Sequence, residues 1–213
     1  MALRHSPGTP LRYSLALALS LAVGTGAVTA YTVLTAPLTI ATGSISIAGT
    51  SNVHAYTVST ATVRVTRVQL AAAVAGPTFW EDVVKPGAVE AFEISIPAAS
   101  LTSPKKDLDK NMHKALKVTE HQEITFRLRR LEPRSGTPGA LRGIGVLQIA
   151  GVEREVALDL TTTRTDAGLQ VHGSLDLLMT DFGITPPKAM LGMLKTDPKV
   201  TVTFDTLITV PST

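Results

Sequence analysis

Hydrophobic and polar residues alternate along most of the chain beyond residue 38, which is the period of a β-strand with one buried face. The alternation is clear where Phe92 and Ile94 flank Glu93 and are followed by Ser95. Ala150 and Gly151 between two such runs indicate a tight hairpin. We expect strands at 44–48, 53–70 (a long stretch with room for a bend), 92–96, 124–129, 143–149, 155–162, 169–179 and 200–210.

These seven or eight strands predict an antiparallel sheet closed on its apolar side, and either a sandwich or a barrel would satisfy this pattern.

One segment departs from the alternation. Ser103 and Pro104 are typical of a helix start, and Leu108, Met112 and Leu116 follow at helical spacing. An amphipathic helix is therefore expected over 104–116. A shorter helix is expected over 186–194, and 71–87 is expected to be a loop anchored by Trp80.

The segment between the last two strands is unusually apolar for a connector, because connectors normally run over the surface. It holds three of the five Met residues and one of the five Phe residues. Methionine is flexible and suits surfaces that must fit a variable partner. We therefore expect this segment to cover something apolar, with Met179, Phe182, Met190 and Met193 forming the mouth of the closed sheet.

The first 30 residues have the order of a secretory signal peptide. Arg4 and Arg12 form a basic start, residues 15–23 are apolar and uncharged, and Val28 and Ala30 are spaced for a signal peptidase. The rival is an uncleaved anchor over 15–34, since a bilayer span needs about 20 apolar residues. We assign 1–30 to a signal peptide, 31–44 to a tether and 45–213 to one folded domain outside the cytoplasm.

Charge and cysteine content exclude several functions. Removing Arg4 and Arg12 with the leader lowers the net charge from +3 to +1, and the densest basic cluster, residues 127–130, alternates along a strand. Nucleic-acid binders instead concentrate charge on one surface, so no nucleic-acid partner is expected. The chain has no Cys, which excludes disulfides, thiolate zinc sites and Cys nucleophiles.

No catalytic or metal-binding pattern stands out. The chain lacks G-x-S-x-G and H-E-x-x-H. His54, His113, His121 and His172 do not have the spacing of converging metal ligands. We therefore expect no catalysis, no metal and no cofactor. An enzyme would require polar groups that converge inside the closed sheet, and none can be placed there from the sequence.

Several stretches, in this order, resemble the YceI family of extracytoplasmic proteins. Ala55 departs from the family pattern, in which a polar residue, commonly Asp, follows His54. The similarity covers roughly residues 45–210, and the order and spacing of the stretches carry it rather than any one motif. The matching stretches are 51–54, 92–97 with 100–101, 107–116, 124–126, 145–152, 179–184 and 200–204.

The resemblance implies an all-β fold, an eight-stranded antiparallel lipocalin-like barrel with one amphipathic helix alongside. It also implies an apolar ligand in the lumen, such as a polyisoprenoid. The inward residues that would bind it, with the cover, are Phe92, Ile94, Phe126, Leu128, Leu175, Leu177, Met179, Phe182, Met190, Met193 and Phe204. Gly145 and Gly173 are expected to leave space, while Asp181, Lys188 and Lys195 are solvated charges or contacts for a polar head group.

The resulting expectation is an extracytoplasmic carrier for an apolar amphiphile, without catalysis. Contact with a membrane would be transient or made through an uncleaved N-terminal segment, and a homodimer is left open. The alternative is an envelope stress or interaction module with a solid barrel core and no lipid. Trp80 and the 186–194 segment would then be its contact surfaces. An open lumen distinguishes the first function from the second.

Overall fold

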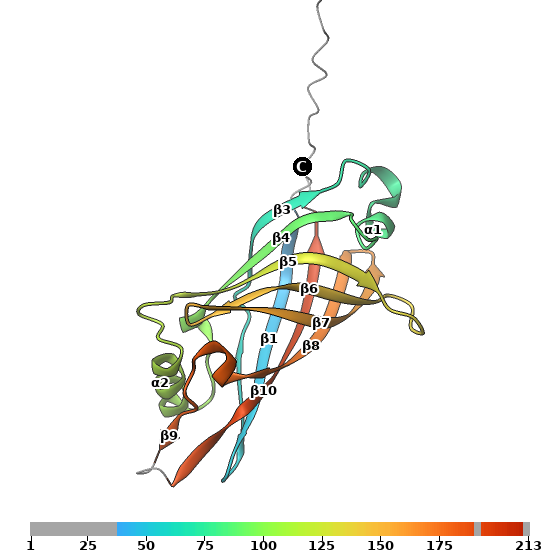
Figure 1. The fold of residues 1–213 in the computed structure, drawn as a ribbon. Helices are drawn as coiled ribbons and strands as arrows, with labels where there is room; N and C mark the ends of the chain where they lie inside the picture. The colour runs from blue at the N-terminus through green and yellow to red at the C-terminus, as the bar shows by residue number, and fades with distance from the viewer. Residues whose placement is uncertain (1–37, 190–192, 211–213) are drawn as a thin grey trace, which may run out of the picture. The chain divides into compact units, whose positions relative to one another are not determined.

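The computed structural model describes residues 38–189 and 193–210 (Figure 1). The expected signal peptide, most of the tether and Met190 lie outside these residues. Residues 39–44, which the sequence places in the tether, instead form the first half of a strand. None of the described helices is long and apolar enough to cross a lipid bilayer.

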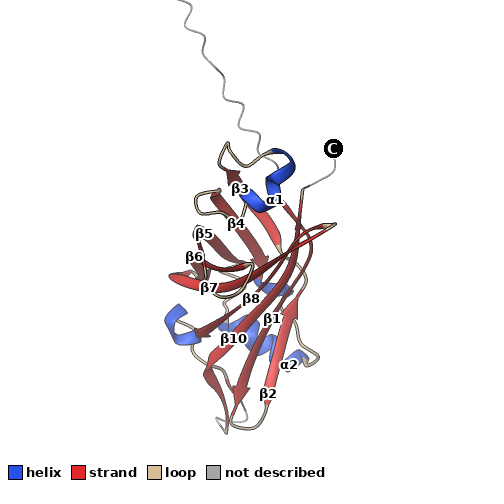
Figure 2. Ribbon diagram, turned by 90° about the vertical axis from the view of Figure 1, so that its right-hand side faces the viewer, coloured by secondary structure: helices blue, strands red, loops and turns tan. Residues whose placement is uncertain are grey.

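Residues 38–189 and 193–210 form ten strands and five helical segments, which Figure 2 shows as red arrows and blue ribbons. The strands are β1 (Thr39–Ser51), β2 (Ala55–Thr60), β3 (Arg64–Leu70), β4 (Val89–Pro97), β5 (Glu123–Pro133), β6 (Ala140–Ile149), β7 (Val152–Thr165), β8 (Gly168–Leu178), β9 (Lys188–Ala189) and β10 (Leu194–Thr209). The α-helices are α1 (Phe79–Asp82) and α2 (Lys106–Ala115), and the short 3₁₀ helices are η1 (Gly76–Thr78), η2 (Ala98–Ser100) and η3 (Met179–Phe182).

Nine strands form one curled antiparallel sheet, in the order β2-β1-β10-β8-β7-β6-β5-β4-β3. The two strands at its edges, β2 and β3, are consecutive in the chain and are joined by residues 61–63. This short connection brings the end of one edge strand to the start of the other. The sheet between them curls into the shape of a barrel (Figure 1). The expected count of eight strands is corrected here, because the long stretch 53–70 is divided by this bend into β2 and β3.

The helix predicted over 104–116 is confirmed, and the helix predicted over 186–194 is wrong. The amphipathic helix is α2, which begins two residues later than predicted, after Lys105. The helix expected over 186–194 is not formed, because Lys188 and Ala189 form β9 and pair with Lys195 and Leu194 of β10. The expected Trp80 loop contains a second short helix, α1.

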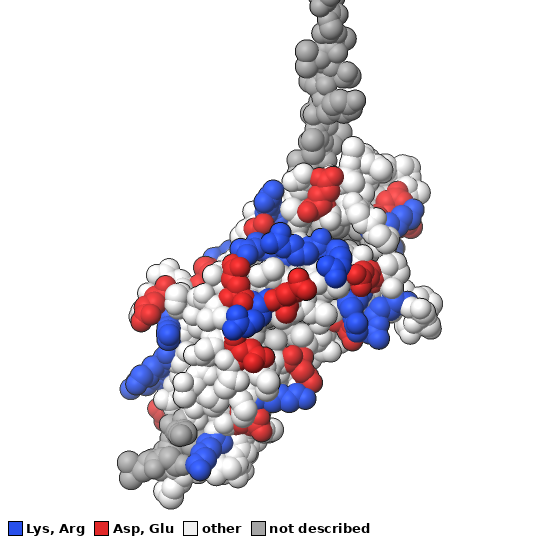
Figure 3. Space-filling model, viewed as in Figure 1, with Lys and Arg blue, Asp and Glu red and all other residues white. Residues whose placement is uncertain are grey.

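The outer face of the barrel carries alternating positive and negative charges (Figure 3). Arg127 pairs with Glu153 across 2.8 Å, and Arg142 pairs with Asp159 across 3.1 Å. Lys199 and Asp176 are 2.8 Å apart. The last two pairs join neighbouring strands, and the first reaches from β5 across β6 to β7. All three keep charge on the outside, so the inner face is left to apolar side chains.

Candidate functional site

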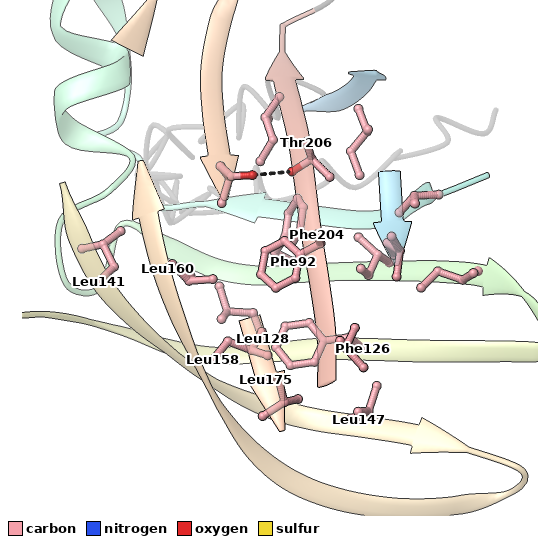
Figure 4. Close-up of a pocket in the computed structure, with 18 of the residues that line it drawn as sticks. Phe92, Phe126, Leu128, Leu141, Leu147, Leu158, Leu160, Leu175, Phe204 and Thr206 are labelled. Carbon is pink, nitrogen blue, oxygen red and sulfur yellow. Dashed lines mark hydrogen bonds between the residues drawn. The ribbon is translucent and has the colours of Figure 1, made fainter. Parts of the chain in front are cut away.

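An apolar cavity of about 230 Å³ lies inside the barrel. Its walls come from β1, β4 to β8 and β10, together with Trp80 of α1. In antiparallel strands successive side chains point to opposite faces, so each strand contributes every second residue to the interior. Figure 4 shows these side chains converging from several strands.

Each residue that the sequence predicts for the inner wall lines this cavity. The set is Phe92, Ile94, Phe126, Leu128, Leu175, Leu177 and Phe204. Strand pairing brings them together: Phe92 lies opposite Leu128, and Ile94 opposite Phe126, between β4 and β5.

The expectation that Gly145 and Gly173 leave space for a ligand is wrong. Gly173 lies opposite Phe204 between β8 and β10, and a Cβ atom there would come within 2.3 Å of the Phe204 ring. A Cβ atom at Gly145 would come within 2.5 Å of the Phe126 ring. Both glycines therefore make room for aromatic rings of the wall.

A second apolar cavity of about 150 Å³ lies beneath α2 and η3. Leu108, Met112, Ala115 and Leu116 of α2 form one side of it. The two cavities are adjacent, because they have wall residues in common: Ile47, Leu101, Ile124, Ile149, Leu177 and Val202. The main cavity is lined at one end by Trp80 of α1, and the second cavity is lined by residues of α2; the two helices lie at opposite ends of the barrel (Figures 1 and 2).

The residues expected to cover the barrel do not lie together. Some line the second cavity, and one is exposed on the surface. Met179 and Phe182 line the second cavity, and Phe182 is only 2% exposed. η3 is closed by Gly183, whose φ of 66° is left-handed, the conformation that glycine adopts most readily. This turn directs Ile184 inward, where it is buried.

Met193 lines neither cavity and is 67% exposed. It directly precedes β10, where the side chain of Asn52 contacts the backbone. The Asn52 side chain donates from Nδ2 to the Met193 carbonyl and accepts from the Lys195 amide, both at 2.8 Å. Met190 lies outside the described residues.

The sequence missed two groups of wall residues. The apolar stripe of α2 was recognised as a helix face, but it was not connected with a cavity. At the opposite end, Trp80, Val83 and Val84 also line the main cavity. Their signal was the adjacent pair Phe79–Trp80 in an otherwise small-residue loop, which indicated an anchor but not its position.

The walls of both cavities are uncharged. Among the residues that the structure describes, no Asp, Glu, Lys or Arg side chain lines either cavity. In the main cavity the Thr206 hydroxyl donates to the Val171 carbonyl at 3.4 Å (Figure 4). The Thr162 hydroxyl donates to the Gly139 carbonyl at 3.1 Å. Both hydroxyl groups thus already donate a hydrogen bond to a backbone carbonyl.

The polar groups of the second cavity are Tyr56, Asn111 and Thr196. Burial raises the pKa of the Tyr56 hydroxyl, and the nearby Asp197 carboxylate raises it further, so this hydroxyl stays protonated. Carboxyls with lowered pKa values lie on the exterior instead: hydrogen bonds from Lys199 and Thr201 lower the pKa of Asp176. In the described residues, no cluster of three His, Asp or Glu is arranged to hold a metal ion.

Solved structures with the same fold come from several bacteria. BcnA of Burkholderia cenocepacia is 16% identical, with a TM-score of 0.59 over 77% of this chain and 94% of BcnA. A domain of Saccharophagus degradans described as polyisoprenoid-binding is 12% identical, with a TM-score of 0.57 over 82% of this chain and 98% of that domain. The YceI protein of Campylobacter jejuni is 13% identical, with a TM-score of 0.52 over 71% and 82% of the two chains.

A comparison with curated proteins gave no match. The sequence model of the YceI-like domain, however, matches residues 38–207, nearly all of the described structure. It includes the curled sheet, α2 and both cavities, and it confirms the resemblance carried by the short stretches of sequence. The chain therefore belongs to the YceI-like domain family.

Proposed function

We propose that this domain binds a long apolar amphiphile, such as a polyisoprenoid, inside the barrel and carries or sequesters it without chemical change. The observation that carries the proposal is the pair of adjacent uncharged cavities, one lined by Trp80 of α1 and the other by residues of α2. Together the two cavities reach the lower part of the roughly 300–1,000 Å³ range of small-molecule sites. Each roughly 100 Å² of apolar ligand surface removed from water would contribute about 2.5 kcal/mol.

We place this function outside the cytoplasm. The basic, apolar and small-residue order of residues 1–30 supports export. A domain of Saccharophagus degradans with the same fold is described as polyisoprenoid-binding, which supports the ligand class. A water-filled compartment outside the cytoplasm is also where a lipid requires a protein to cross from one apolar environment to another.

The competing function, an interaction module without a lipid, requires a solid barrel. A well-packed core has few voids larger than a water molecule. The main cavity is far larger than the space that one water occupies, about 30 Å³ in the liquid. The cavity therefore favours binding over a purely structural core.

Extraction of the purified protein with organic solvent, followed by mass spectrometry, tests the proposal. We expect a lipid with a long apolar chain in an amount close to one molecule per protein. A clean extract, combined with failure of the protein to take up any added prenol, would contradict the proposal and favour the interaction module.

Leu177→Arg is the substitution that most directly blocks the site. Leu177 lines both cavities and is 9% exposed, so an arginine there places an unpaired charge in the apolar space. We expect lipid uptake to be abolished. Leu178→Arg is the matched control, because Leu178 is next in the strand but 43% exposed, and it should leave uptake unchanged.

Circular dichroism and thermal unfolding would establish that each variant is folded. If Leu177→Arg does not fold, Leu177→Gln introduces a polar group without a charge at the same place. Normal lipid uptake by a folded Leu177 variant would show that this face of β8 does not meet the ligand.

A further inference from the structure

We propose that Trp80 is the floor of the ligand site and sets the longest apolar chain that the domain accepts. This inference rests on the proposed function. Trp80 lines the main cavity together with Val83 and Val84. It belongs to α1, in the segment 71–88 between β3 and β4, at the end of the barrel opposite α2 (Figures 1 and 2).

Trp80 packs against an apolar cluster that closes this end of the barrel. Its buried members are 4–7% exposed: Leu38, Leu70, Val74, Val83, Ala88 and Leu169. Backbone hydrogen bonds fix the segment that carries α1, since the Ala71 amide donates to the Ala88 carbonyl at 2.9 Å and the Ala88 amide to Lys85 at 3.1 Å. A chain that enters the barrel therefore meets a packed wall at this end.

The Trp80 ring is held from two sides. The Phe79 ring meets it edge to face, with centroids 5.0 Å apart and planes at 87°. The guanidinium carbon of Arg164 lies 5.2 Å from the Trp80 ring centroid, a favourable cation–π distance. Arg164 is itself fixed at the β7–β8 turn, because its Nη1 donates to the Gly168 carbonyl at 2.7 Å. Trp80 thus resists displacement by a ligand.

The distribution of polar groups orients the ligand with its tail toward Trp80. Thr162 and Thr206 of the main cavity already bond backbone carbonyls. The polar side chains of the second cavity are those of Tyr56, Asn111 and Thr196, none of them fully buried, so this is where a polar head group would be met. Because no charged side chain of the described residues lines either cavity, the head group is uncharged, as in an alcohol, amide or quinol.

A graded series of linear prenols that lengthens by one isoprene unit, starting from farnesol, tests the floor. For the lipid-free wild-type protein we expect affinity to rise with each unit and then to stop rising at a limiting length. Replacing the indole by a smaller side chain lengthens the space, so Trp80→Ala should move this limit by at least one unit. For the first prenol beyond the wild-type limit, the variant should bind several-fold more tightly.

Trp80→Leu and Trp80→Phe give smaller changes of volume, and they carry the test if Trp80→Ala is too unstable to purify. Glu81→Ala is the matched control, because Glu81 follows Trp80 in α1 but is exposed and does not line the cavity, and its limiting length should equal that of the wild type. An unchanged limit in folded Trp80 variants, or an equal loss of affinity at every length, overturns the role of Trp80. Failure of the wild-type protein to bind any prenol overturns the proposed function itself.

Discussion

The two ends of the barrel are built from the same strands but are covered in different ways. At the α1 end, residues 71–88 contribute the buried side chains Val74, Val83 and Ala88. At the α2 end, no residue of 103–121 is buried, and a cavity of about 150 Å³ remains beneath the helix. Regions with few buried apolar contacts open most readily, so we expect the ligand to enter at α2 and to stop at α1.

α2 packs on the core through the partly buried side chains of Met112 and Ala115, and two polar contacts add to this attachment. The His113 Nε2–H donates to the Leu101 carbonyl at 2.8 Å. The Asp109 carboxylate accepts from the Ser103 amide, also at 2.8 Å. Such contacts contribute only about 0.5–1.5 kcal/mol each, which is small enough for the helix to move without unfolding the sheet. The difference between the ends therefore separates a closed base from a movable cover.

Truncating one large apolar side chain at each end gives the largest expected difference. Leu70→Ala, at a position 4% exposed, should lower the free energy of unfolding by about 2–5 kcal/mol, through lost burial and the new void. Met112→Ala at the α2 end should cost only about 1 kcal/mol, since its side chain is partly exposed and already borders a cavity. Urea unfolding of both variants measures this, and equal losses would remove the distinction between base and cover.

Substitutions that weaken the attachment of α1 or α2, but leave the cavity walls unchanged, should differ in their effect on the rate of lipid exchange. His113→Ala removes the bond to Leu101, so we expect bound lipid to exchange several-fold faster, with a loss of stability of about 1 kcal/mol. Arg164→Gln at the α1 end removes the cation on Trp80, at a cost of about 0.5–1 kcal/mol, and should leave the exchange rate unchanged. Transfer of a fluorescent lipid to vesicles reports both rates. Faster exchange in Arg164→Gln alone would place the entrance at α1.

Acid stability should show the smallest difference, because both ends carry a comparable exposed carboxylate. Hydrogen bonds from Lys85 and Thr78 lower the pKa of Asp82 near α1, and those from Lys199 and Thr201 lower the pKa of Asp176. A pKa below the ordinary 3.8 in the folded state adds stability above that pH, and the gain is lost as the pH falls through the lowered value.

Asp82→Asn and Asp176→Asn should therefore each be slightly less stable than the wild type at pH 7, and equal to it in strong acid. Both carboxyls are on the surface, so the differences should shrink in high salt. Urea midpoints across the pH range provide the measurement. A difference that persists in strong acid would mean that the side-chain shape, rather than the charge, is responsible.

Strand alternation predicted the inner wall because its information is local. Whether Phe126 or Leu175 points inward depends only on the period of two along its own strand. The spacing of Leu108 and Met112 predicted α2 for the same reason, since a helix face repeats within a few residues. The curling of the sheet was not contained in these periods and came from the resemblance to a family.

The errors arose where distant segments decide the structure. The roles of Gly145 and Gly173 depend on which residues lie across from them, and strand register is not visible in one strand alone. The segment around Lys188 has helix-like spacing of Met and Leu, but backbone pairing with β10 prevails. Trp80 lies in a segment without a period, so its position at the floor of the cavity depends on how that segment folds back over the barrel.

The bend at residues 61–63 also has a consequence for how copies of this protein behave beside one another. It leaves the sheet with two short edges, of which β2 is further occupied where Ser59 exchanges two backbone hydrogen bonds with Thr102. β3 carries Arg64 and Arg67, which lie near Glu123 of β5 and Glu93 of β4. Short, charged or covered edges offer little template to a foreign strand. The bend that divides one long strand into two therefore also protects the protein from edge-to-edge aggregation.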